Sequence, residues 1–206
     1  MFKNRTEAAE ALVRKLQHFK NTNAIVLAIP RGGIPLGAIV AKALSLPLEP
    51  LLAKKVGHPK NPEYAIASVS LQGTVINSSV RDVSLEYIQR ECARVQKSLV
   101  DKFQLFMGGR NASEVQGKIV ILIDDGVATG NTLLAAIDAV KKSNPLKIVL
   151  AVPVAAPSAA ELLKREVDEF HALLIPDDFR SVGQFYQNFD QVTDAEVIAL
   201  LKSLIK

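Results

Sequence analysis

Short, uninterrupted apolar segments that alternate with segments of helical spacing constrain this fold more than any other feature. Residues 24–29 and 118–123 are two such segments, and each runs directly into a glycine-containing stretch. Continuous apolar runs are typical of strands buried on both faces, as in parallel sheets. Strands that alternate with helices wind into layered α/β folds. We therefore predict a single α/β domain with a doubly wound, mostly parallel sheet and helices on both faces.

The same patterns predict the order of the elements. Strands are expected at 24–29, 48–56, 118–123, 147–154 and 171–175, with a hairpin of 65–70 and 74–77 around Gln72 and Gly73. Helices are expected at 5–19, 34–45, 84–106, 132–143 and 157–166, and a last helix opens with a capping box from Thr193 to Glu196. Residues 57–64 contain two prolines and a glycine and should form a loop.

The helix at 84–106 carries an apolar stripe with spacings of three or four residues, which begins at Leu85. The only cysteine of the chain, Cys92, falls on this stripe and is expected to be a small core residue. One cysteine allows no disulfide within the chain, which fits a reducing compartment. The N-terminus has no apolar signal core, and no window is long enough to span a membrane. These features predict a cytoplasmic protein.

The net charge of +4 comes from 25 basic and 21 acidic residues. This small basic excess suits an anionic small molecule. The basic residues are scattered and form no run of five, so binding to nucleic acid is not expected.

The segment after Ile123 has the composition of a sugar-phosphate site. Ligands of open parallel sheets bind beyond the carboxyl ends of the strands. Two carboxylates, Asp124 and Asp125, leave the strand together, and a glycine-containing turn then opens a helix with hydroxyls at Thr129 and Thr132. Convergent N–H groups and a helix N-terminus bind phosphate. Because the acids would repel that phosphate, they are expected to accept hydrogen bonds from a neighbouring diol.

The residues from Ile121 to Thr132, with the sequence ILIDDGVATGNT, resemble the phosphoribosyl pyrophosphate (PRPP) motif of type I phosphoribosyltransferases. Pro-Arg-Gly-Gly at 30–33 resembles the pyrophosphate loop of that family, and Lys54-Lys55 its basic pair. The resemblance covers the whole chain, 1–206, with a core of about 20–154. A "hood" is expected to consist of 155–206 and the N-terminal helix.

The resemblance implies a role for each matching residue. Asp124 and Asp125 would bind the ribose hydroxyls, and Arg31, Gly32, Gly33 and Lys55 the pyrophosphate. The 5-phosphate would be bound by two sets of donors. The N–H groups come from Gly126, Val127, Ala128, Thr129 and Gly130, and the hydroxyls come from Thr129 and Thr132.

The resemblance further implies transfer of ribose-5-phosphate from PRPP to a nitrogenous, nucleobase-like acceptor. Mg²⁺ would be held mainly by PRPP and water oxygens, since the sequence has no dedicated metal cluster. Loop 57–64 would close over the site, with Glu63 as the proton-handling carboxylate. Phe179 would stack on the acceptor. The family also admits a homodimer, with the helix at 84–106 as one interface.

Two other functions are compatible with parts of this pattern. A PRPP-sensing regulator would keep the site without turnover, but the retained Arg31, Lys54 and Lys55 favour catalysis. A dinucleotide-binding oxidoreductase would need Gly-x-Gly-x-x-Gly after the first strand, and Gly32, Gly33 and Gly37 do not have that spacing. Ala128 replaces the Asp that contacts the purine in the oxopurine branch, so the acceptor stays open.

Overall fold

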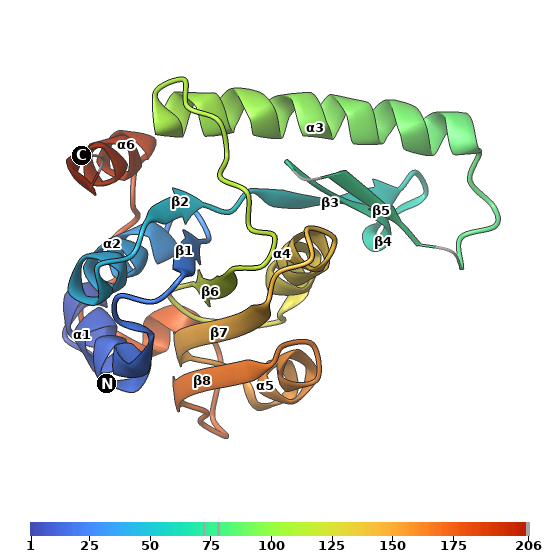
Figure 1. Cartoon of the computed structure of the whole chain (residues 1–206). Helices are drawn as coiled ribbons and strands as arrows, with labels where there is room; N and C mark the ends of the chain where they lie inside the picture. The colour runs from blue at the N-terminus through green and yellow to red at the C-terminus, as the bar shows by residue number, and fades with distance from the viewer. Residues whose placement is uncertain (72, 78, 205–206) are drawn as a thin grey trace.

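The computed structural model describes residues 1–71, 73–77 and 79–204, and all their side chains except that of Glu63. Its centre is the predicted parallel sheet, which has five strands in the order β2-β1-β6-β7-β8 (Figure 1). The strands are β1 (Ala24–Ala28), β2 (Leu48–Pro50), β6 (Ile119–Ile123), β7 (Lys147–Val154) and β8 (Glu169–Leu174).

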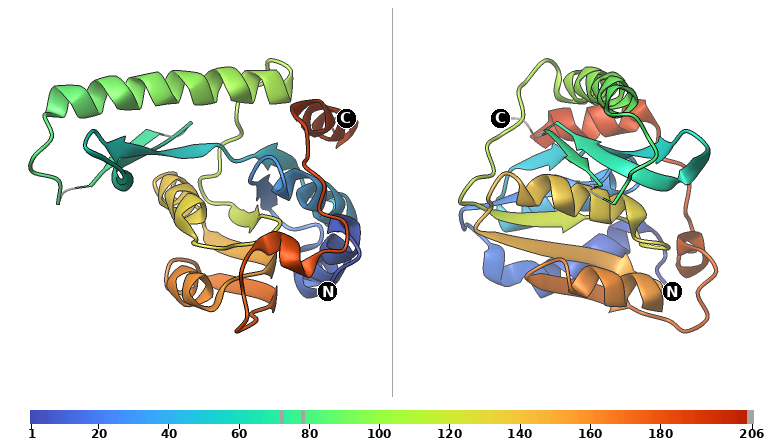
Figure 2. Two further views of the ribbon diagram at one scale, coloured as in Figure 1. Left: turned by 180° about the vertical axis from the view of Figure 1, so that it is seen from behind. Right: turned by 90° about the vertical axis from the view of Figure 1, so that its right-hand side faces the viewer.

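Helices cover both faces of this sheet (Figure 2). The strand residues alternate between two cores. On β6, Ile121 and Ile123 pack in one core, whereas Val120 and Leu122 pack in the other. The first core includes α1 (Arg5–Leu16), its 3₁₀ extension η1 (Gln17–Phe19) and α2 (Gly33–Leu44), and the second includes α4 (Asn131–Lys141) and α5 (Pro157–Lys164). Period-two alternation with burial on both sides explains why the strands read as continuous apolar runs.

A second layer stands beside the main sheet. Its antiparallel sheet contains β3 (Ala53–His58), β4 (Asn61–Ser70) and β5 (Gly73–Ile76), and α3 (Leu85–Met107) lies across it (Figure 1). The predicted hairpin is confirmed as β4 and β5, although Gln72 of its turn lies outside the described residues. Cys92 is buried on the apolar stripe of α3, as expected, but Leu85 at the start of the helix is 58% exposed.

Two predictions about residues 48–64 are wrong. The single strand predicted at 48–56 is divided between the two sheets, because Leu51 and Leu52 turn the chain and pack into opposite cores. The loop predicted at 57–64 is mostly strand, with Pro59 and Lys60 as the turn between β3 and β4. The register shifts at Gly57, where an added Cβ would lie 2.8 Å from Cα of Pro62, so this glycine permits a close approach that the sequence pattern does not reveal.

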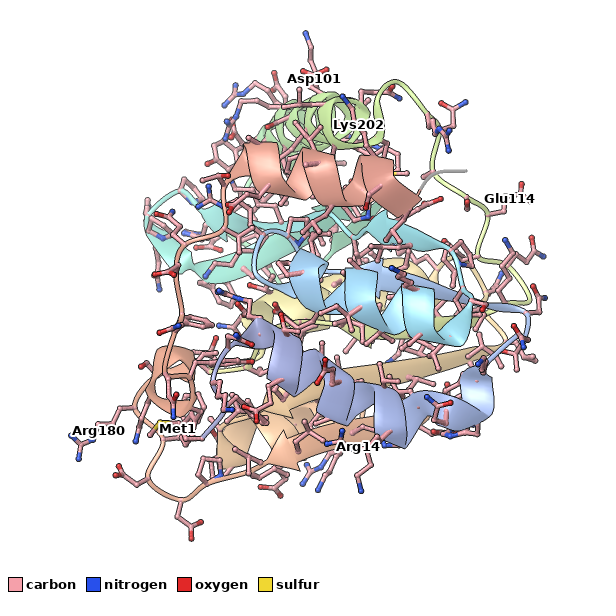
Figure 3. All side chains as sticks on the ribbon, turned by 90° about the vertical axis from the view of Figure 1, so that its left-hand side faces the viewer. Met1, Arg14, Asp101, Glu114, Arg180 and Lys202 are labelled. Atoms are coloured by element: carbon pink, nitrogen blue, oxygen red, sulfur yellow. The ribbon has the colours of Figure 1, made fainter. Side chains whose placement is uncertain are left out.

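The C-terminal part returns to the N-terminus. The α5–β8 unit extends the main sheet, and the following segment carries the short 3₁₀ helix η2 (Val182–Phe185). Phe2 forms a bridge with Tyr186, so the N-terminal residues lie beside this segment; Figure 3 shows Met1 and Arg180 at the same end of the molecule. The last helix, α6 (Asp194–Leu204), packs against α2 and α3 and has the predicted capping box, in which the Glu196 amide donates to Thr193 Oγ1 at 3.2 Å. None of the described helices has the length and apolar content needed to span a bilayer.

Candidate active site

The pyrophosphate-loop residues and the acidic pair meet where β1 and β6 end. These strands are neighbours, with Ala28 opposite Ile123, so the segments that follow them leave the sheet side by side. The Ile29 amide donates to the Ile123 carbonyl at 2.8 Å, and the Pro30–Arg31 peptide bond is cis. An added Cβ at Gly33 would lie 2.7 Å from the Ile123 carbonyl oxygen, so only glycine allows this approach. The structure therefore brings together the two segments that the sequence singled out.

Asp124 and Asp125 are both partly buried and differ in their partners. Asp124 Oδ1 accepts the Asp125 amide at 2.9 Å. Burial raises the pKa of Asp124 well above its ordinary value, and the charge of Asp125 raises it further. Burial also raises the pKa of Asp125, but hydrogen bonds from Arg5 and its charge oppose that rise. The two carboxyls therefore differ in how easily they ionise, and the negative charge is favoured on Asp125.

Replacing Asp124 by Asn should stabilise the free protein at neutral pH. The unfolded chain ionises at the ordinary pKa of 3.8, whereas folding raises the pKa of this carboxyl, so stability falls as the pH rises from 3.8 towards the folded-state pKa. The amide removes this penalty, which is about 1.4 kcal/mol for each unit of pKa elevation. Thermal unfolding from pH 4 to 8 should show a gain in Tm that grows with pH.

The exposed Asp101, on α3, gives the matched control for that measurement. Asp101→Asn should leave Tm within about 1 °C of wild type, because surface substitutions change stability little. A variant Asp124→Asn that melts below wild type at every pH would contradict the assigned penalty on ionisation.

The predicted phosphate cradle lies at the N-terminus of α4, and one of its amides already has a partner within the protein. Val127 is buried, and its N–H donates to the Val154 carbonyl at 2.9 Å. This N–H is therefore not available to a ligand. The prediction that every amide from 126 to 130 binds phosphate is therefore wrong for Val127. Within the described part of the chain, the amides of Ala128, Thr129 and Gly130 have no backbone acceptor and adjoin the positive end of α4.

A cavity of about 670 Å³ joins this cradle to the second layer. Thr129 and Thr132 line one side, and Lys55 of β3 lines the other, so the structure brings together three of the predicted ligands. Arg94 of α3 also lines the wall, where its guanidinium donates to Glu91 Oε2 at 2.8 and 3.0 Å. The division of the predicted strand at Leu51 is what carries Lys55 out of the main sheet to this position.

The acidic pair does not line this cavity, and neither do Phe179 and the loop at 30–33, which includes Arg31. Arg31 has its Nη1 atom 3.8 Å from Oδ1 of Asp194, at the start of α6. Phe179 is half-buried, and its ring stacks on Phe185 at a centroid distance of 5.6 Å. The backbone of Glu63 belongs to β4, but its side chain lies outside the described part of the structure, so its role stays a prediction.

Sequence reasoning missed Arg5. Two of its nitrogens, Nε and Nη2, donate to Asp125 Oδ2 at 2.9 and 2.8 Å. The two residues are 120 positions apart, and Arg5 stands among ordinary helix-forming residues, so the sequence carries no signal for this contact.

Tyr186, in the C-terminal segment, also contacts the acidic pair, and the sequence carries no signal for this contact. Its buried hydroxyl donates to the Asp125 carbonyl at 2.6 Å, and its ring stacks on Phe189. The C-terminal segment therefore touches the acidic pair directly.

Comparisons with known proteins agree with this geometry. A family model described as "Phosphoribosyl transferase domain" matches residues 2–189, which include every predicted site residue. The crystal structure of TT1426 from Thermus thermophilus is 36% identical and superimposes with a TM-score of 0.90 over 100% of this chain and 99% of that one. "Putative phosphoribosyl transferase MT0597" of Mycobacterium tuberculosis is 34% identical over 98% of this chain but only 46% of its own, so this chain spans about half the length of that curated relative. The chain belongs to the phosphoribosyl transferase domain family.

Proposed function

We propose that the protein transfers ribose-5-phosphate from PRPP to a nitrogenous, nucleobase-like acceptor and releases pyrophosphate. The observation that carries this proposal is the meeting of the acidic pair at 124–125 with the loop at 30–33, beside the open amides before α4. A diol, a phosphate and a pyrophosphate each have a complementary group there. Family membership supports the same reaction class.

The 5-phosphate would bind at the N-terminus of α4. The amides of 128–130 donate to it, and the Thr129 and Thr132 hydroxyls complete the cradle. Gly130 has φ +78°, a left-handed conformation that glycine adopts without strain. The ribose then reaches back towards Asp124 and Asp125.

The leaving pyrophosphate would be stabilised by Arg31, by the amide of Gly32 and by Lys55, whereas the Gly33 amide already donates to the Ile29 carbonyl at 2.9 Å. Cleavage of the bond between C1 and oxygen moves its electron pair to the pyrophosphate and leaves positive charge on the ribose, which the acceptor nitrogen then attacks. Fixed cations stabilise the first change and the carboxylate of Asp125 the second, each by a few kcal/mol. Glu63 is our candidate for accepting the proton that the acceptor loses.

Mg²⁺ fits this site only as an ion carried by the substrate. Among the described residues, no group of three His, Cys, Asp or Glu side chains is placed to hold a metal. Arg5 already occupies Oδ2 of Asp125, so Asp124 would be the carboxylate that holds the ion or its waters. When bound, Mg²⁺ would neutralise charge on the pyrophosphate.

The acceptor would lie against the segment after β8. Phe179 is positioned there with one face on Phe185. A flat acceptor ring would therefore stack on the opposite face of the Phe179 ring or pack against the edge of that ring.

Calorimetric titration with PRPP, with and without Mg²⁺, tests the proposal. We expect Mg²⁺-dependent binding, and at 100 times Kd the ligand should add about 2.7 kcal/mol of stability, which thermal unfolding reads independently. Asp125→Asn should lose this binding because the amide cannot replace both the charge and the acceptor, whereas Asp101→Asn should retain it.

The outcome also separates the two functions. Release of pyrophosphate with at least one nucleobase establishes a transferase. Binding without turnover on any base would favour a PRPP-sensing regulator, and no binding at millimolar PRPP would contradict both.

A further inference from the structure

Arg5 is fixed on every side. Its Nε and Nη2 atoms donate to Asp125 Oδ2, while Nη1 donates to the Asp190 carbonyl at 2.8 Å. The guanidinium carbon lies 4.0 Å from the centroid of the Phe189 ring, a cation–π distance. The Arg5 side chain is only 13% exposed, so solvent screens these contacts weakly.

The partner of Arg5 is equally restrained. The Asp125 side chain is 14% exposed and lies against Gly32, and its carbonyl accepts the Tyr186 hydroxyl. Both bonds from Arg5 converge on Oδ2, so the ion pair does not use Oδ1 as a fork-to-fork arrangement would. A sugar hydroxyl can therefore donate to Oδ1 while both hydrogen bonds from Arg5 to Oδ2 remain.

The Arg5–Asp125 ion pair also changes the charge of the site, in addition to attaching α1. Two adjacent acids without a cation would repel each other and would repel a sugar phosphate. Arg5 reduces the charge of the group of Arg5, Asp124 and Asp125 to −1 when both acids are ionised. The residues around Arg5 also attach these acids to the C-terminal segment. Phe2, three residues before Arg5, donates its amide to the Phe185 carbonyl at 2.8 Å.

We propose that Arg5 is a positioning residue for ribose recognition: it orients Asp125 for a sugar hydroxyl and couples that carboxylate to the docking of α1 and the 182–190 segment. The inference rests on the proposed function, which assigns the ribose to Asp125. A purely structural ion pair predicts a different result, because its loss would lower stability without any preference among ligands.

Two small probes separate these roles. Inorganic phosphate reports on the anion-binding groups of the α4 cradle and the 30–33 loop, whereas ribose 5-phosphate adds the sugar. In calorimetric titrations of the full chain, Arg5→Gln should weaken ribose 5-phosphate by about 10- to 100-fold, as expected for loss of a charge-assisted hydrogen bond. Phosphate affinity should change less than about twofold. Arg5→Lys, which keeps the charge but not the two-nitrogen grip, should fall between.

Arg14→Gln is the matched control, since Arg14 is an exposed arginine at the other end of the same helix (Figure 3). It should leave both affinities unchanged. In Asp125→Asn, a second change of Arg5→Gln should add little further loss, because the two residues act as one unit.

Equal weakening of both probes, or no change in ribose 5-phosphate binding by Arg5→Gln, would overturn the inference while the proposed function stands. Absence of PRPP binding by the wild-type chain would instead overturn the proposed function and the inference together.

Discussion

Gly32→Ala should weaken PRPP binding by about 100-fold or more, the largest binding effect expected of a one-carbon change in this protein. The backbone at Gly32 has φ −62°, which alanine adopts easily, so the effect comes from space. The new Cβ would lie 2.5 Å from the carboxyl carbon of Asp125 and closer still to Oδ2. The carboxylate must move, and both bonds from Arg5 end on that oxygen. Calorimetric titration with PRPP and Mg²⁺ measures the loss.

Gly117→Ala provides the comparison. Gly117 has φ +68° and nothing within 4 Å of an added Cβ, so alanine strains the backbone there without touching the site. It should cost about 1 kcal/mol of stability and leave PRPP affinity unchanged. If Gly32→Ala binds PRPP as wild type does, the Asp125 carboxylate is not required in its observed position.

Phe106→Ala should lower the free energy of unfolding by about 3 to 5 kcal/mol. Phe106 is fully buried near the end of α3 and belongs to the core shared by α1, α2 and α6, so its removal leaves a cavity that several elements border. For a domain of this size that loss corresponds to a fall in Tm of roughly 6 to 20 °C. Urea or thermal unfolding measures it.

The neighbouring Leu105 supplies the control on the same helix. Its side chain is 57% exposed, so Leu105→Ala should change stability by only about 0.5 kcal/mol. Similar losses for both variants would mean that α3 does not contribute to the cooperative core.

Local sequence was sufficient wherever a single element carried the signal. The parallel sheet follows from runs such as Ile119–Ile123, because a strand covered on both faces is apolar at every position. The capping box at Thr193 follows from two residues three positions apart. The acidic pair and the phosphate cradle follow from a strand end, where the topology of an open sheet places ligands.

Predictions failed where a distant segment decided the outcome. The strand predicted at 48–56 divides because Leu51 and Leu52 face different cores, which no local pattern encodes. Residues 57–64 pair as a hairpin because Gly57 lets Pro62 approach. The Val127 amide is lost to ligands because the Val154 carbonyl, 27 positions later, accepts it.

The sequence alone determined the α/β sheet, the family and the residues at the ends of β1 and β6, because those depend on period, burial and motif within short windows. Only the tertiary structure decided the electrostatics of the acidic pair. Arg5 opens the first helix and Tyr186 lies in the C-terminal segment, yet both contact Asp125. Contacts across such separations arise from packing of whole layers, and it is packing that makes one carboxylate the preferred anion and leaves its neighbour with a raised pKa.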